Sequence, residues 1–181
     1  MRRVCDFDPV SKSSVKLDRI LEELVEVKAA GEKAIVFSYV IEPLQVLHEM
    51  SQKAINGVFI SGQMNGSERS NVISRFKENP DVTALFASSK VASEGLTLVE
   101  ANHVFFINRW WNPSSNAQAR DRVNRIGQKR TVFIHEYVCA GTVEEKIQKL
   151  LNHKGEIYKN VVGKLEDLLL NDPEIKAHLK G

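Results

Sequence analysis

Short apolar runs that alternate with amphipathic segments constrain the fold of this chain more than any other feature. The runs lie at residues 34–37, 58–60, 82–87, 103–107 and 131–138. Runs this short and rich in apolar side chains are typical of strands, and the first two have the pattern of strands buried on both faces. Strands that alternate with helices indicate a parallel sheet covered on both faces. The sequence therefore predicts an α/β fold with a doubly wound parallel sheet.

Amphipathic helices are expected between these strands. Residues 15–30 repeat apolar side chains every three or four positions, and Gly31 provides a stop. The next helix is expected to start near Pro43, because proline suits the first helical turn. Two more are expected to begin at a Ser67 cap and at Asn112-Pro113, the last of them closed by Gly127.

Composition limits the classes of protein to consider. The chain has 181 residues, of which 43% are hydrophobic and 27% charged, so it is not mostly disordered. Its apolar runs are far shorter than the ~18 residues of a membrane span, and no secretion signal is expected. Cys5 and Cys139 form no ligand pattern, so no metal site is expected. We expect a lead-in over residues 1–12, one lobe over 13–152 and a helical extension over 153–181.

Positive charge is concentrated in one segment. Residues 109–130 contain six basic side chains against one acid, Asp121, whereas the net charge of the whole chain is only +2. On the expected helix, Arg122 and Arg125 would share a face with Gln118, and Asp121 would pair with Arg125. Two arginines so close favour an anion, and phosphate suits the guanidinium fork. On charge pattern alone, a solvated basic face remains the alternative.

The residues around these arginines resemble a known family. Residues 118–128 read Gln-Ala-Arg-Asp-Arg-Val-Asn-Arg-Ile-Gly-Gln, which resembles the last helicase motif of the Swi/Snf family of ATP-dependent DNA translocases. Further segments resemble other motifs of that family in the same order: residues 33–39, 61–76, 88–98, 111–113 and 141–147. The resemblance covers nearly the whole chain. It implies the second of two RecA-like helicase lobes.

In that family ATP binds between the two lobes. The resemblance implies that Arg122 and Arg125 are arginine fingers and that Gln118, Asp121, Glu94 and Gly95 lie on the nucleotide side of the cleft. ATP with magnesium is the expected cofactor, held mainly by the first lobe, because this chain has no Gly-x-x-x-x-Gly-Lys-(Ser/Thr) loop. The N-terminal helicase lobe is therefore an expected partner, and the chain alone is expected not to hydrolyse ATP.

Double-stranded DNA is the other partner that the resemblance implies. The matching positions for DNA contacts are Ser38, Gly62, Asn65, Gly66, Ser67, Ser88, Ser89 and Lys90. No membrane partner is expected, and the compartment would be the nucleoid-containing cytoplasm in a bacterium or the nucleus in a eukaryote. A non-catalytic module that binds DNA or a regulator is the alternative function. An RNA-unwinding relative is disfavoured by the Trp-Asn-Pro and Ile-Gly-Gln sequences.

Overall fold

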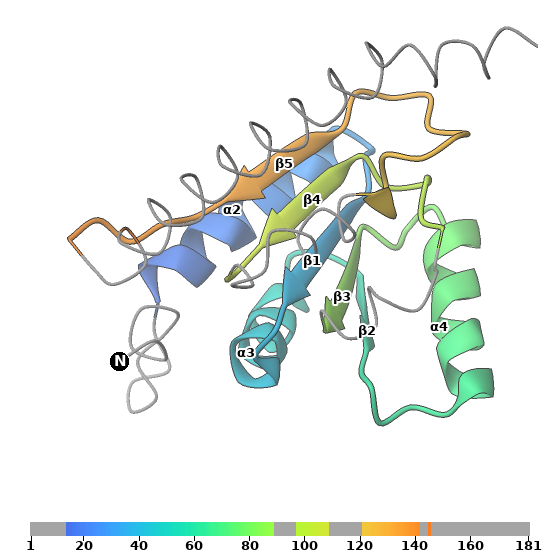
Figure 1. Ribbon diagram of the computed structural model, residues 1–181, viewed down its shortest axis with the longest axis horizontal. Coiled ribbons are helices and arrows are strands. Elements are labelled where there is room, and N and C mark those ends of the chain that lie inside the picture. Colours follow the sequence, from blue (N-terminus) through green and yellow to red (C-terminus); the bar gives the residue numbers. More distant parts are fainter. Residues whose placement is uncertain (1–13, 89–96, 109–120, 142–144, 146–181) are drawn as a thin grey trace, which may run out of the picture.

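The predicted strands and three of the predicted helices are present in the structure, a computed structural model that describes residues 14–88, 97–108, 121–141 and 145 (Figure 1). The helices are α2 (Val15–Ala29), α3 (Ile41–Ser51) and α4 (Gly66–Glu78). The strands are β1 (Ala34–Ser38), β2 (Gly57–Ile60), β3 (Ala84–Ser88), β4 (His103–Phe106) and β5 (Phe133–Glu136). Because apolar runs mark the strands directly, the predicted strand ends differ from the observed ones by at most two residues.

All five strands pair in parallel, in the order β2-β3-β1-β4-β5. In the central strands, Ala34 of β1 lies opposite Ala84 of β3 on one side and His103 of β4 on the other. The predicted doubly wound parallel sheet is confirmed. Since the strands run the same way, the segments that follow them all leave from one edge, which we call the carboxyl edge.

Helices α2 and α3 cover one face of the sheet, and α4 lies on the other (Figure 1). Val36 of β1 faces α2 and α3, whereas its neighbours Ile35 and Phe37 join the cluster that contains Phe76 of α4. Strand β1 is buried along its whole length, which explains its uninterrupted apolar run. Strand β5 lies at the sheet edge and is mostly exposed.

One helix start agrees with its prediction and another does not. Helix α3 begins at Ile41, so Pro43 lies in its first turn as expected. Helix α4 is capped by Asn65 and not by Ser67, because Asn65 stands three residues before Glu68 and the two form a capping box. The helix expected from Asn112-Pro113 and the C-terminal extension lie mainly outside the described residues, and the domain boundaries remain predictions.

Candidate functional site

Residues 121–128 form what we call the arginine turn. Asp121 is helical, but the residues after it adopt turns and bends as far as Gly127, where φ is +108°. The backbone N–H of Arg125 bonds to the carbonyl of Val123, 3.1 Å away, and that of Gln128 bonds to the carbonyl of Arg125, 3.0 Å away. The prediction that a helix places Arg122 and Arg125 on one face is therefore wrong. Gly127 instead closes a turn in the left-handed conformation that glycine favours.

Contacts with residues 97–101 explain why the helix does not continue. The carbonyl of Arg122 accepts a 2.9 Å hydrogen bond from the backbone N–H of Leu98. Val123 is completely buried in the cluster that also contains Leu98 and Ala101. The side-chain amide of Gln128 donates to the carbonyl of Ala101 at 2.7 Å and to that of Val99 at 3.1 Å. These partners lie in another segment of the chain, so tertiary contacts override the local helical pattern.

Arg125 is exposed, and its guanidinium is held by a hydroxyl group. Its Nη1 donates to Oγ1 of Thr97 over 2.8 Å. The predicted ion pair with Asp121 is absent, and within the described part of the chain no carboxylate lies within ion-pair distance of Arg125. A neutral partner orients the guanidinium without neutralising it, and leaves its other donors available to an anion. Arg122 is half-buried.

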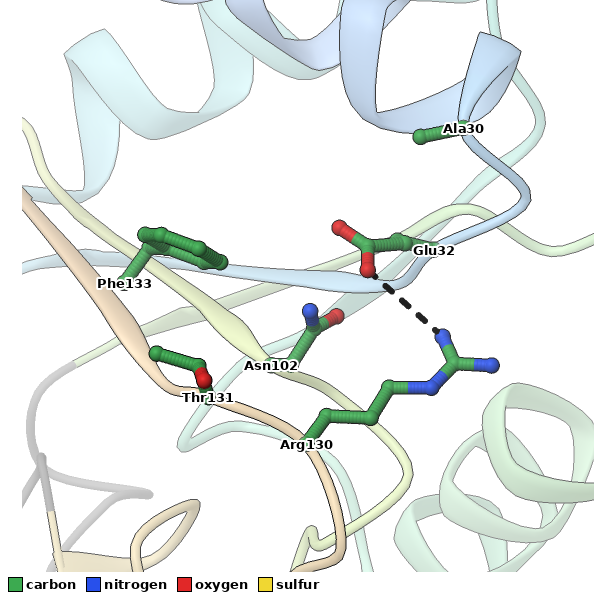
Figure 2. A pocket seen from close by; sticks show the side chains of 6 residues that line it. All are labelled: Ala30, Glu32, Asn102, Arg130, Thr131 and Phe133. Carbon is green, nitrogen blue, oxygen red and sulfur yellow. Dashed lines mark ion pairs between the residues drawn. The ribbon is translucent and has the colours of Figure 1, made fainter.

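Arg130, just beyond the turn, has an acidic partner. Its Nη1 lies 4.0 Å from Oε1 of Glu32, and a dashed line marks this ion pair in Figure 2. The two side chains line an open hollow of about 520 Å³ with Ala30, Asn102, Thr131 and Phe133. The pKa of Glu32 is held below its ordinary value, mainly by a hydrogen bond with His103. The Asn102 amide and the charge of Arg130 also lower this pKa, whereas burial opposes them. Arg130 therefore lies within ion-pair distance of a carboxylate of this chain, unlike Arg125.

At the carboxyl edge, Ser38 shapes a turn. Its side chain is fully buried, and its hydroxyl lies 2.6 Å from the carbonyl of Val40 and 3.2 Å from Oδ1 of Asn108. The same Oδ1 accepts the backbone N–H of Tyr39 at 3.0 Å. Asn108 thus ties the residues after β4 to those after β1. The hydroxyl of Ser38 serves the turn, and its contact with DNA remains a prediction.

The start of α4 presents open backbone at the same edge. Gly62, Gly66 and Ser67 are exposed, and a Cβ added at either glycine would meet nothing within 4 Å. The capping box uses the N–H groups of Asn65 and Glu68. The N–H groups of Gly66 and Ser67 have no acceptor among the described residues. Free N–H groups at a helix start are suited to a phosphate oxygen.

Ser88, at the end of β3, is 7% exposed, and its hydroxyl has no hydrogen-bond partner in the described part of the chain. The remaining predicted site residues lie outside the described residues: Gln118, Glu94, Gly95, Ser89 and Lys90.

The structure separates the candidates into two places. Ser38, Ser88 and the start of α4 follow the carboxyl ends of strands, whereas Gln128 bonds to residues that lead into the amino end of β4. Figure 1 shows the segment between residue 121 and the start of β5 at the opposite end of the sheet from the β2–α4 connection. Thr97 and Gln128 were not predicted as site residues. Gln128 belongs to the closing Ile-Gly-Gln sequence, but no spacing rule indicates what its amide contacts.

Neither a membrane helix nor a metal cluster is found in the described segments. No helix there is long and apolar enough to cross a bilayer. No three His, Cys, Asp or Glu side chains in these segments gather in a way that would hold a metal ion.

The five-stranded parallel sheet and its covering helices have the architecture of the RecA-like C-terminal lobe of a helicase-type ATPase. The model of the helicase conserved C-terminal domain matches residues 15–127. The chain therefore belongs to this family, and its relatives place it in the SWI2/SNF2 group of helicases and translocases.

Two relatives illustrate the group. The putative ATP-dependent helicase/translocase YwqA of Bacillus subtilis is 33% identical over 151 residues, which are 82% of this chain and 16% of that protein. The DNA repair protein rad8 of Schizosaccharomyces pombe is 35% identical over 147 residues, or 80% of this chain and 13% of rad8. The chain thus spans less than a fifth of either relative.

Two solved structures support the same family assignment. The C-terminal part of the Fun30 ATPase domain superposes with a TM-score of 0.73 at 29% identity, over 77% of this chain and 45% of that one. The Sulfolobus solfataricus SWI2/SNF2 ATPase core in complex with double-stranded DNA gives a TM-score of 0.72 at 29% identity, over 96% of this chain and 39% of that one. The predicted Swi/Snf C-terminal lobe is confirmed.

Proposed function

We propose that this lobe completes the ATPase site of a double-stranded DNA translocase by supplying Arg122 and Arg125 to ATP. The nucleotide, with its magnesium, is held mainly by an N-terminal lobe that carries the phosphate loop. The observation that carries this proposal is the state of Arg125, which is exposed and oriented by the hydroxyl of Thr97. An arginine held in this way retains its charge for the γ-phosphate, where charge develops during phosphoryl transfer.

The DNA backbone is proposed to cross the carboxyl edge. The open backbone at Gly62 and Gly66, the free N–H groups at the start of α4 and the buried hydroxyl of Ser88 support phosphate contacts there. Contacts of this kind read no base edges, which suits a motor that moves along any sequence. A relative of this fold has been solved with double-stranded DNA, and this supports the choice of ligand.

The arginine assignment is tested by ATP hydrolysis with double-stranded DNA, measured for this chain alone and joined to its first lobe. We expect the lobe alone to be inactive, and Arg125→Ala or Arg122→Ala to lower the rate of the joined protein by ~10³-fold or more. Arg125→Lys should also be impaired, because lysine lacks the planar fork.

Lys129→Ala is the matched control, because Lys129 is an exposed cation close to the turn. Lys129→Ala removes one positive charge, as the arginine variants do, but not from a residue proposed to contact ATP. The ATPase rate of this variant should therefore match that of the wild type. Unchanged rates in both arginine variants, with DNA binding retained, would instead support a non-catalytic binding module.

A further inference from the structure

Helical hydrogen bonds do not fix the position of the arginine turn. Beyond Asp121 its backbone is nonhelical, and the carbonyl of Arg122 is taken by Leu98. Arg125 itself is exposed, so no burial of its side chain determines where it points. The buried side chain of Val123 and the Leu98–Arg122 bond hold the start of the turn against residues 97–101, so the part that follows Arg125 needs contacts of its own.

Gln128 forms hydrogen bonds both within the arginine turn and to residues 97–101. Its Nε2 lies 2.7 Å from the carbonyl of Ala101, 3.1 Å from that of Val99 and 3.4 Å from that of Val123. Its Oε1 accepts the backbone N–H of Arg130 at 2.9 Å. Every partner is a backbone group, so the amide fixes the path of the chain on both sides of Arg125.

Gly127 makes this arrangement possible. Its φ of +108° is a conformation that other residues rarely adopt, and it precedes the residue whose amide reaches residues 99 and 101. The backbone N–H of Gln128 also closes the turn on the carbonyl of Arg125, 3.0 Å away. Gln128 thus fixes the backbone around Arg125 in two ways. Its side chain bonds to Val123 and Arg130, and its backbone N–H closes the turn on Arg125 itself.

We propose that Gln128 is a positioning residue for the finger Arg125. This inference rests on the proposed function, because it assigns Gln128 a role that acts through Arg125. The amide sets the turn so that the Arg125 guanidinium meets Thr97 and faces a nucleotide held by the first lobe. A displacement of about 1 Å in such a group lowers a reaction rate by ~10²-fold.

The test is steady-state ATP hydrolysis by the chain joined to its first lobe, with double-stranded DNA. Gln128→Glu keeps the shape and the acceptor for Arg130, but it loses the donors and places a carboxylate against three carbonyls. We expect kcat to fall by ~10²-fold while KM for ATP changes little, because the first lobe holds most of the nucleotide. Gln45→Glu makes the same chemical change at an exposed position on α3 and should leave both constants unchanged.

A double-mutant cycle separates positioning from a general loss of structure. In an Arg125→Ala background, Gln128→Glu should lower the rate only slightly further, since the finger it positions is already gone. An equal loss in both backgrounds would overturn the positioning role. No effect of Arg125→Ala would overturn the proposed function instead, so the two failures are distinguishable.

If Gln128→Glu does not fold, Gln128→Met carries the same test, because it keeps the length of the side chain and adds no charge. Hydrogen exchange of the Leu98 N–H gives a readout that does not depend on activity. Its bond to the carbonyl of Arg122 joins the two segments, so exchange should accelerate in the Gln128 variants. Wild-type exchange together with wild-type kcat would overturn the inference.

Discussion

Asn65 begins helix α4 through two reciprocal hydrogen bonds with Glu68. Its Oδ1 accepts the N–H of Glu68 at 2.9 Å, and its own N–H donates to Oε2 of Glu68 at 3.0 Å. Both Asn65 and Ser67 are good capping residues, and a list of preferences does not choose between them. The choice follows from spacing, because only Asn65 stands three residues before a glutamate. The sequence contained this signal, although the prediction favoured Ser67.

The cap is tested by urea unfolding of the chain. Asn65→Ala should lower the free energy of unfolding by ~1 kcal/mol, because it removes one bond and leaves an N–H of the first turn without its acceptor. Ser67→Ala, an exposed change within the helix, should shift it by less than ~0.5 kcal/mol. A larger loss for Ser67→Ala would contradict this assignment of the cap.

At the scale of elements, strand β2 lies so close to a buried ring that only glycine fits at its start. Gly57 pairs with Ala84 in the sheet, and a Cβ at position 57 would lie 2.6 Å from Cε2 of Phe86. Phe86 is fully buried and its ring lies edge-on to His48 of α3, with centroids 5.1 Å apart. The ring has little room to move away, so the packing of α3 on the sheet depends on this glycine.

Gly57→Ala should therefore lower the free energy of unfolding by ~1–3 kcal/mol, the usual cost of an overpacked core. Gly62→Ala is the matched control, because its added Cβ would meet nothing within 4 Å. It should be neutral or slightly stabilising, since alanine reduces the freedom of the unfolded chain. Urea unfolding of both variants measures the difference, and equal stabilities would show that Phe86 accommodates the methyl group.

At the scale of the whole molecule, a chain of polar side chains attaches helix α2 to the edge of the sheet. Oε2 of Glu23 in α2 lies 2.8 Å from Nδ1 of His135 in β5 and 2.6 Å from the hydroxyl of Tyr137. Nε2 of His135 lies 3.0 Å from Nδ1 of His103 in β4. The other ring nitrogen of His103 contacts the carboxylate of Glu32, which precedes β1. Contacts that join four parts of the fold are lost together when it unfolds.

This polar chain predicts that stability decreases in acid. Burial lowers the pKa of His135 from 6.5 although Glu23 opposes this, so protons bind it more readily in the unfolded chain. Burial tends to raise the pKa of Glu23, but the Tyr137 hydroxyl and the charges of His135 and Arg19 bring it below 4.5. Both groups favour the folded state at neutral pH. The His135 contribution decreases as pH falls below about 6.5 and that of Glu23 below about 4.5.

Urea midpoints between pH 7 and pH 3.5 measure this dependence. The midpoint should fall with pH, and below about 4.5 it should fall less steeply in Glu23→Gln, which has no carboxylate there to protonate. Identical slopes for the two proteins below that pH would show that Glu23 does not link folding to protonation.

The sequence by itself determined the kinds of element, their order and the family, because apolar periodicity and short motifs are local. The buried runs that became β1 and β3 could be recognised without any knowledge of their neighbours. The motif around Arg122 and Arg125 likewise indicated chemistry before any geometry was available.

Only the tertiary structure decided how the arginines are held. Gln128 bonds to carbonyls 27 and 29 residues away, and Arg125 bonds to Thr97, 28 residues away. His135 likewise meets Glu23 across 112 residues. Helical spacing predicts contacts three or four residues apart. Hydrogen bonds over longer separations exist only once the sheet has brought the segments together, and at the arginine turn these bonds replace those of the expected helix.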